Sequence, residues 1–205
     1  MQIEQHINSG TIKSLRPLLE QWVSVVHKYL KFCNWEDCQW WYTEPASISS
    51  LSAAAWQLGG IAIEEYSVEK GKKAELWSGK CDLYIDTGIQ KFACEGKQIW
   101  TAIGRKASQK CDDIKSGLNS ACDDARKLKK DEGRRLGLCF VIPYLPPSEE
   151  PYIDEMLHEW LRKIETLDYS SIAWVFPKKV RKIKGDDGYF YPGVVLLVKE
   201  VFRQS

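Results

Sequence analysis

The sequence lacks the short motifs that identify several large enzyme classes. It has no glycine-rich phosphate loop, no serine-nucleophile motif and no dinucleotide-binding fingerprint. Histidine is also scarce: the chain has only three, His6, His27 and His158, and none has a recognisable partner. The sequence therefore argues against enzymes built on those motifs and against catalysis by a histidine.

Long apolar runs and a strong net charge are missing as well. No apolar run approaches the length that crosses a bilayer, and no signal peptide is recognisable at the first residues. We therefore expect a cytoplasmic protein that makes no contact with membranes. The formal net charge of the 205 residues is +1, so contact with a nucleic acid has to come from a local basic patch.

Cysteine is present in an odd number, which does not suit a disulfide framework. We expect all seven cysteines to be free and structural, in a reducing compartment. A zinc site at Cys33 and Cys38 would have only His27 nearby, and this ligand set is too small and poorly spaced. Apolar residues make up 44% of the chain and charged residues 28%, as in an ordinary soluble globular protein.

The spacing of apolar residues predicts a succession of helices and strands. Leu15, Trp22 and Tyr29 belong to a helical pattern in which Pro17 fits only the first turn. A hairpin turn over 71–73 separates the first two strands, and Ser78-Gly79 interrupts the second. The predicted elements are helices over 12–32 and 45–58, strands over 61–68, 74–86 and 90–97, a long helix from Ile103 to Leu128, a strand over 136–142, a helix that begins near Ser148, and strands over 171–176 and 189–202.

This order predicts an α/β fold with a mixed central β-sheet flanked by helices. A hairpin-type start is followed by strand–helix–strand crossings, which place helices on the faces of a sheet. No internal repeat, low-complexity tract or linker divides the chain. We expect one globular unit, in which residues 1–43 form an N-terminal helical extension packed on an α/β domain of residues 44–205.

Two neighbouring predicted strands carry charged residues where buried strands would carry apolar ones. Asp82 lies in the second strand, and Glu95 and Lys97 end the third. Residues two apart on a strand point to the same face, so Glu95 and Lys97 lie together, and a hairpin brings Asp82 near them. Two carboxylates and one amine in a small volume suit a Mg²⁺ ion and a water nucleophile.

This arrangement resembles the PD-(D/E)XK nuclease superfamily, which has the restriction-endonuclease-like fold. The resemblance covers residues 44–142 and includes the helix before the first strand and the helix after the third. It implies that Asp82, Glu95 and the Gly96 carbonyl bind Mg²⁺ or Mn²⁺. It also implies that Lys97 stabilises the attacking hydroxide or the charge that develops on the phosphate. The chain departs from the pattern at Cys81, where the superfamily has proline, and at Gly96, where an apolar residue is more usual.

Many members of the superfamily use one more acid, from the helix that precedes the first strand. Glu44, at the start of the second helix, is the best match, and Glu64 and Glu65 on the first strand are the alternatives. Strand alternation allows only one of Glu64 and Glu65 to point toward Asp82.

Two basic stretches are candidates for contact with phosphates, which lysine and arginine bind without reading sequence. The first could instead be a hairpin tip that keeps charge on a sheet edge, and the second a solvated helix end whose cations suit the helix dipole. We select the first, called the basic loop, as the nucleic-acid contact. The basic loop is Lys178, Lys179, Arg181, Lys182 and Lys184, and the second stretch is Arg126, Lys127, Lys129, Lys130, Arg134 and Arg135.

The sequence thus predicts a metal-dependent nuclease that hydrolyses phosphodiester bonds, with DNA favoured over RNA as substrate, in restriction, defence or repair. One alternative is a catalytically inactive nuclease-fold module that binds nucleic acid or a partner protein. Another is purely structural, with Asp82 and Lys97 as a cross-strand ion pair and Glu95 solvated. A homodimer and an activating partner protein are both left open.

Overall fold

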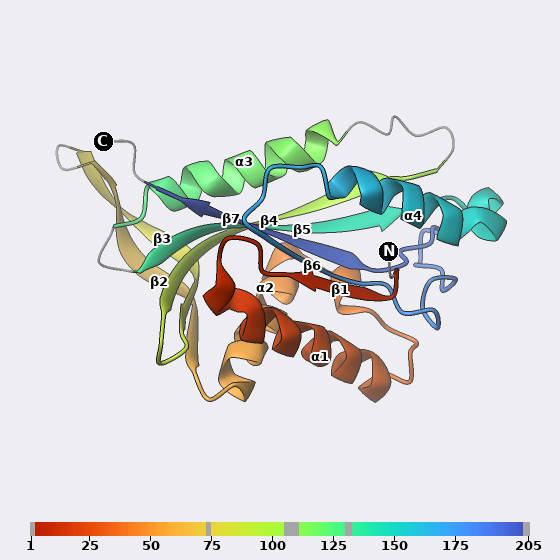
Figure 1. Ribbon diagram of the computed structural model, residues 1–205, viewed down its shortest axis with the longest axis horizontal. Helices are drawn as coiled ribbons and strands as arrows, with labels where there is room; N and C mark the ends of the chain where they lie inside the picture. The colour runs from red at the N-terminus through yellow and green to blue at the C-terminus, as the bar shows by residue number, and fades with distance from the viewer. Residues whose placement is uncertain (1–2, 73–74, 105–110, 130–132, 203–205) are drawn as a thin grey trace.

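A central β-sheet has α-helices on both of its faces (Figure 1). The structure is a computed structural model, and it describes residues 3–72, 75–104, 111–129 and 133–202. The strands are β1 (Gln5–Asn8), β2 (Ile61–Lys72), β3 (Glu75–Asp86), β4 (Lys91–Ala102), β5 (Arg134–Tyr144), β6 (Ser171–Val175) and β7 (Val194–Val201). The α-helices are α1 (Arg16–Phe32), α2 (Glu44–Gln57), α3 (Asp112–Arg126) and α4 (Ile153–Ile164), with 3-10 helices η1 (Lys13–Leu15), η2 (Gln39–Trp41) and η4 (Pro147–Tyr152).

The seven strands form one mixed sheet in the order β1-β6-β7-β5-β4-β3-β2. Strands β4 and β5 run parallel, and α3 connects them across the sheet. Every other pair of neighbouring strands is antiparallel. The predicted mixed sheet with flanking helices is confirmed.

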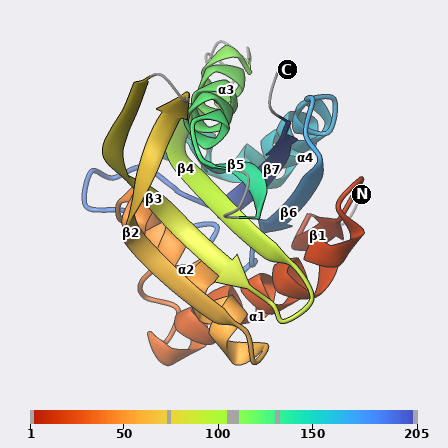
Figure 2. The same cartoon turned by 90° about the vertical axis from the view of Figure 1, so that its left-hand side faces the viewer.

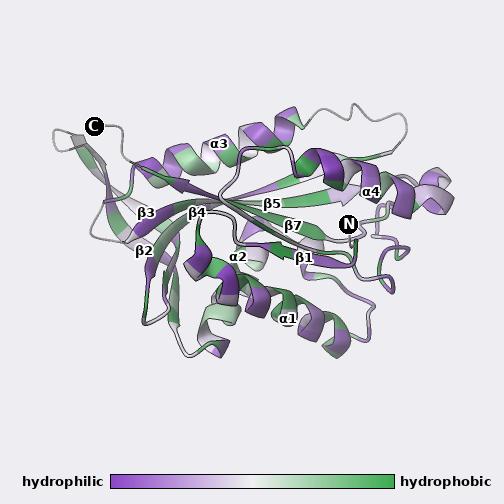
Figure 3. Cartoon of the chain, in the orientation of Figure 1, coloured by the Kyte–Doolittle hydropathy of each residue, from purple (hydrophilic) through white to green (hydrophobic). Residues whose placement is uncertain are grey.

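The sheet separates two apolar cores. Helices α1 and α2 cover one face, and α3 and α4 cover the other (Figures 1 and 2). Pro17 lies in the first turn of α1, as predicted, and Leu18, Trp22 and Val26 of this helix are buried in the first core. Figure 3 shows β5 and β7 as largely apolar and the outer surfaces of the helices as largely hydrophilic. In the part of the chain that is described, no helix combines the length and apolar character needed to cross a membrane.

Strand β3 differs from the prediction, because it continues through Ser78 and Gly79 without an interruption. Gly79 has a packing role there. A Cβ atom at this position would lie 3.0 Å from Cδ of Lys70, the side chain of which crosses Gly79 from β2. The interruption predicted at Ser78-Gly79 is therefore wrong, because the glycine makes room for a neighbouring side chain and does not form a turn.

The helix after the third strand also begins later than predicted. Strand β4 extends to Ala102, where it is still paired with Tyr144 of β5, and α3 starts only at Asp112. Ile103 is not helical, and Ala107, which belonged to the helical pattern, lies outside the described residues. Pairing with the buried strand β5 keeps the residues up to Ala102 extended. The periodicity of apolar residues along the chain does not reveal this pairing, which depends on a distant strand.

The N-terminal extension is part of the sheet as well as of the helical layer. Strand β1, which the sequence analysis did not predict, pairs with β6 at the sheet edge. The Ser171 hydroxyl donates a hydrogen bond of 2.7 Å to the Ser9 carbonyl and fastens this edge. Helix α1 packs against α2, so the described part of residues 1–43 shares the core of the remaining chain.

Candidate functional site

The predicted site residues lie where β3 separates from β4. The ladder between these strands runs from Asp86↔Lys91 to Leu83↔Cys94, and Asp82 is the next residue of β3. Opposite Asp82 in the β2–β3 register stands Glu65, which has a φ of 53°. This distortion accompanies the departure of the β2–β3 hairpin from the sheet. The hairpin then reaches the end of α3, where the Gly71 amide donates a 3.0 Å hydrogen bond to the Lys127 carbonyl.

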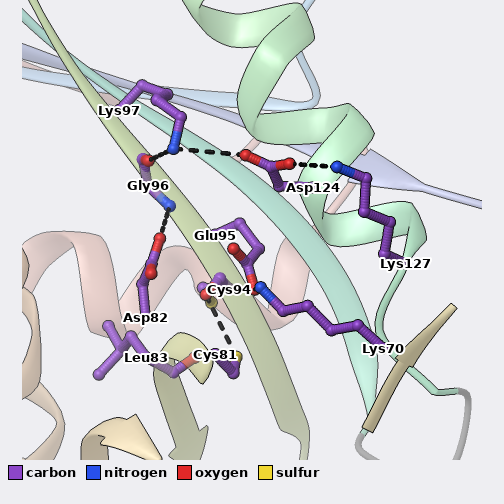
Figure 4. Close-up of polar contacts among 10 residues, drawn as sticks. All are labelled: Lys70, Cys81, Asp82, Leu83, Cys94, Glu95, Gly96, Lys97, Asp124 and Lys127. Carbon is purple, nitrogen blue, oxygen red and sulfur yellow. Dashed lines mark hydrogen bonds and ion pairs between the residues drawn. The ribbon is translucent and has the colours of Figure 1, made fainter. Parts of the chain in front are cut away.

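Asp82 and Lys97 meet at the backbone of Gly96 (Figure 4). The Gly96 amide donates a 2.8 Å hydrogen bond to Oδ2 of Asp82, so a side chain replaces the missing strand partner. The Lys97 ammonium donates a 2.8 Å hydrogen bond to the Gly96 carbonyl, the predicted third metal ligand. The hairpin prediction for Asp82 is therefore correct in placing it beside the Glu95-Gly96-Lys97 segment.

Helix α3 contributes an acid that the sequence analysis did not select. Oδ2 of Asp124 lies 3.4 Å from Nζ of Lys97, and Oδ1 lies 2.7 Å from Nζ of Lys127. Burial lowers the pKa of Lys97, but Glu44 and Asp124 raise it, and the net shift is upward. Burial raises the pKa of Asp124, but Lys127 and Lys97 outweigh it, and the net shift is downward. Lys97 thus remains charged, and its ammonium is held between Gly96 and α3.

Glu95 lies in the protein interior with a cation beside it. It is only 3% exposed, and Nζ of Lys70 on β2 lies 2.7 Å from its Oε1. Burial raises the pKa of Glu95 to about 7, although the Lys70 ammonium opposes the shift. The purely structural alternative is not what the structure contains, because Glu95 is not solvated and Lys97 pairs with Asp124 in place of Asp82.

Glu44 approaches the site from the face of the sheet that α2 covers, opposite to α3 and Asp124. It is the first residue of α2, and its Cγ lies 3.8 Å from the position of a Cβ on Gly96. Burial raises the pKa of Glu44, Lys97 lowers it and Asp82 raises it, with a net upward shift, so the three charges act on one another. A Cβ on Gly96 would also lie 2.9 Å from Cδ1 of Ile48. Gly96 therefore gives α2 the space to lie against β4.

The two alternative acids have other partners. Glu64 accepts a 2.8 Å hydrogen bond from the Ser49 hydroxyl, and Glu65 forms a 3.1 Å ion pair with Lys80. Both carboxylates are exposed. Glu44, by contrast, lies beside Gly96, and the charges of Lys97 and Asp82 both act on its pKa.

The donor chemistry of the site fits a hard divalent cation. Carboxylates and a backbone carbonyl are the ligands that Mg²⁺ prefers, and Asp82, Glu95 and Gly96 supply them. In the arrangement described, no group of three or more acidic, histidine or cysteine side chains of residues 3–72, 75–104, 111–129 and 133–202 is disposed to hold a metal. A metal bound to Glu95 would have to replace the Lys70 ammonium at its carboxylate.

The basic loop is divided between surface lysines and one buried arginine. The four lysines are exposed, with Lys179 stacked on Trp35 and Lys182 paired to Glu150 at 3.3 Å. Arg181 is only 3% exposed. Its guanidinium donates to the Phe176 carbonyl at 2.7 and 2.9 Å and to Asp154 at 2.7 Å. Arg181 therefore stabilises the loop, and only the lysines are available to a nucleic acid.

The second basic stretch makes mostly internal contacts in its described part. Lys129 pairs with Glu69, and Arg134 donates a 2.6 Å hydrogen bond to Glu200. Arg135 is buried and donates to the Leu128 carbonyl at 3.2 Å. Lys130 lies outside the described residues. The stretch is therefore not the solvated helix end of the structural alternative, since Arg134 and Arg135 belong to β5 and Arg135 is buried, but its internal contacts give it a structural role.

Comparison of the chain with protein-family models, with curated proteins and with solved structures gave no significant match.

Proposed function

We propose that the protein is a Mg²⁺- or Mn²⁺-dependent nuclease of the PD-(D/E)XK type. The observation that supports this proposal is the meeting of Asp82 and Lys97 at Gly96, at the point where β3 leaves β4. A carboxylate, a backbone carbonyl and an ammonium are close together there, and the flanking acids come from α2 and α3. This set of groups supports phosphodiester hydrolysis better than acyl transfer, since it offers oxygen ligands and a cation, while burial raises the pKa of the neighbouring Cys81 thiol to about 11 and keeps it from acting as a thiolate nucleophile.

Each residue has a distinct role in the proposed reaction. Asp82, Glu95 and the Gly96 carbonyl would hold the metal, which supplies an activated water and polarises the phosphate when bound. Lys97 places a positive charge where charge develops on the phosphate. Asp124 keeps the Lys97 ammonium directed toward Gly96, and Glu44 would add negative charge to the metal shell.

The exposed lysines of the basic loop support a nucleic acid as the substrate, since ammonium groups bind phosphates without sequence preference. We propose DNA as the first substrate to test and restriction, defence or repair as the setting. A cytoplasmic location and a homodimer or partner protein belong to the same proposal.

The decisive experiment is a cleavage panel on single- and double-stranded DNA and RNA, with Mg²⁺, with Mn²⁺ and with chelator. We expect cleavage that requires the metal and is lost in Asp82→Asn and Lys97→Met. Asp113→Asn, on an exposed position of α3, serves as the matched control and retains activity. Absence of cleavage from every substrate, together with absence of divalent binding by calorimetry, would refute the nuclease.

The second candidate is an inactive nuclease-fold module that binds nucleic acid or a protein. The observation in its favour is the ion pair of Lys70 with the buried Glu95, because an ammonium stands beside a carboxylate that the metal would need. Nucleic-acid binding without divalent binding and without cleavage is the outcome that this candidate predicts.

A further inference from the structure

A cavity lies near the carboxyl end of β4, away from the Lys70–Glu95 pair. Its volume is about 440 Å³, and it is formed by the segment around η2, by Trp100 of β4 and by the loop before β7. Its walls contain four aromatic rings and four carboxylates, and no lysine or arginine is among its described lining residues. We call it the aromatic pocket. The rings are Trp41, Tyr42, Trp100 and Tyr191, and the carboxylates are Glu36, Asp37, Asp186 and Asp187.

The rings of the aromatic pocket are fixed and yet accessible. Trp100 meets Tyr191 edge to face, with ring centroids 5.1 Å apart. The Tyr191 hydroxyl donates to Asp187, and the Tyr42 hydroxyl donates to Asp37 at 3.0 Å. Trp100 is nevertheless 39% exposed and Tyr42 51% exposed. Ordered aromatic rings that remain open to solvent are typical of surfaces that receive a ligand.

The charge of the aromatic pocket selects a cation. Its carboxylates repel phosphate, so this pocket is unsuited to the backbone of a nucleic acid. Aromatic faces attract ammonium and guanidinium groups, and the attraction adds to that of nearby carboxylates. Two independent features, the rings and the negative charge, thus favour the same ligand chemistry.

Trp41 presents ring surface and no free hydrogen-bonding atom to the pocket. It is a lining residue, but its indole Nε1 is buried away from solvent and has no hydrogen-bond partner among the described residues. A ligand at this wall therefore needs an apolar portion as well as a cation. The side chains of lysine and arginine combine both, since an apolar stem ends in a charged head.

We propose that the aromatic pocket binds a basic residue of a partner polypeptide. The cation lies against Trp100, Tyr42 and Tyr191 and is neutralised by the pocket carboxylates, and the apolar stem of the basic side chain packs on Trp41. The pocket is joined to the candidate active site, because Gln98 donates a 2.6 Å hydrogen bond from Nε2 to the Tyr42 carbonyl, two residues before Glu44. The proposal concerns partner binding and does not depend on nuclease activity.

The test is an NMR titration that follows the indole N–H signals of Trp41 and Trp100 in the full chain. The probes are N-acetyl-lysine methylamide, N-acetyl-arginine methylamide, the neutral N-acetyl-norleucine methylamide, butylammonium and a nucleoside monophosphate. We expect saturable shifts of both signals with the two basic amides, and binding about fivefold weaker or worse with norleucine. Asp187→Asn and Trp100→Leu should each weaken the binding of the basic amides, whereas Asp113→Asn, on the opposite face of the sheet, should not.

Each remaining outcome would overturn the proposal. Absence of saturable shifts with both basic amides removes the site, and equal binding of norleucine removes the role of the cation. If Asp113→Asn weakens the binding of the basic amides as much as Asp187→Asn does, the effect comes only from the net charge of the protein. Butylammonium binding as tightly as the lysine amide refutes a polypeptide and indicates a small amine, and tighter binding of the nucleoside monophosphate indicates a base-binding pocket.

Discussion

Nζ of Lys70 lies 2.7 Å from Oε1 of Glu95, although the two residues stand on β2 and β4, which are separated in the sheet by β3. The ion pair can form because Gly79 of β3 has no side chain and lets the Lys70 chain pass. Glu95 is thereby buried as one half of an ion pair at the centre of the candidate site. The Lys70 ammonium compensates the charge of a buried carboxylate and occupies a group that the proposed chemistry needs.

Removal of the ammonium should destabilise the protein. We expect Lys70→Met to lower the free energy of unfolding by about 3 kcal/mol at pH 8, because the buried Glu95 carboxylate loses its counter-charge. Glu95→Gln in the same chain should restore most of the loss, since the neutral amide needs no counter-charge. Urea unfolding of the two single variants and the double variant measures this coupling, and simple additivity would contradict it.

Lys70→Met should also bind metal more tightly than the wild type if Glu95 is a ligand. In the wild-type protein the metal has to compete with the ammonium, and in the variant it does not. Calorimetry with Mn²⁺ near pH 8 checks this expectation, with Lys80→Met as a control, since Lys80 is an exposed lysine paired to Glu65. Equal or weaker binding by Lys70→Met would show that Glu95 is not in the metal shell.

In the presence of a chelator, the stability of the protein should depend on pH because Glu95 titrates. Burial raises its pKa from 4.5 to about 7, so between these values the folded state binds more protons than the unfolded state. The free energy of unfolding therefore falls as the pH rises from about 4.5 to 7, by up to about 3 kcal/mol from this group. The difference between wild type and Glu95→Gln, measured by urea unfolding across this range, isolates the contribution. A difference that does not change with pH would mean that Glu95 titrates normally.

The sequence contained the strand positions of Asp82, Glu95 and Lys97, because alternation and turn residues are local signals. It did not contain the partners of these residues. Lys70 reaches Glu95 across an intervening strand, and Asp124 reaches Lys97 from a helix that follows β4 along the chain. Both contacts depend on tertiary packing.

Two element boundaries were missed for a related reason. Ser78-Gly79 has the composition of a turn, and the segment after Lys97 has a helical spacing of apolar residues. In the fold, pairing with β2 keeps the first extended, and pairing with β5 extends β4 to Ala102. Ladder hydrogen bonds to distant strands override both local patterns.

Gly96 provides a test of how closely α2 must approach the site. A Cβ here would lie 2.9 Å from Cδ1 of Ile48, the flexible end of a side chain, so Gly96→Ala should cost about 1 kcal/mol of stability. Ile48→Val in the same protein should recover part of this loss. Gly137→Ala is the contrasting variant, because its Cβ would lie 2.8 Å from the Cys122 backbone nitrogen. It should cost about 3 kcal/mol, and equal losses in the two variants would contradict the packing argument.

Variants of Asp124 and Lys97 should distinguish the positioning of the Lys97 ammonium from its action on the phosphate or the water. Lys97→Met should lower the cleavage rate by about 100-fold or more and leave Mn²⁺ binding in place, since Lys97 is proposed to act on the phosphate or the water. Asp124→Asn leaves the ammonium present but weakens its attachment to α3, so the rate should fall less and the pH profile should shift. Single-turnover rates over a pH series compare the two. A rate in Lys97→Met equal to that of the wild type would remove Lys97 from the site.

The exposed lysines of the basic loop should control the salt dependence of nucleic-acid binding. Replacement of Lys178, Lys179, Lys182 and Lys184 by glutamine should weaken binding similarly for all sequences. It should also reduce the slope of log affinity against log salt by about one unit for each ammonium–phosphate ion pair that is removed. Stability should hardly change, because exposed charges contribute little.

Two further variants make the loop experiment specific. Replacement of Lys13, Lys28, Lys31 and Lys91 by glutamine changes the net charge equally at other exposed positions and should leave the slope nearly unchanged. Arg181→Gln should instead lower the free energy of unfolding by about 3 kcal/mol, because its guanidinium is buried between the Phe176 carbonyl and Asp154. If the loop variant and the charge control have the same slope, the lysines act only through net charge, and the phosphate path lies elsewhere on the molecule.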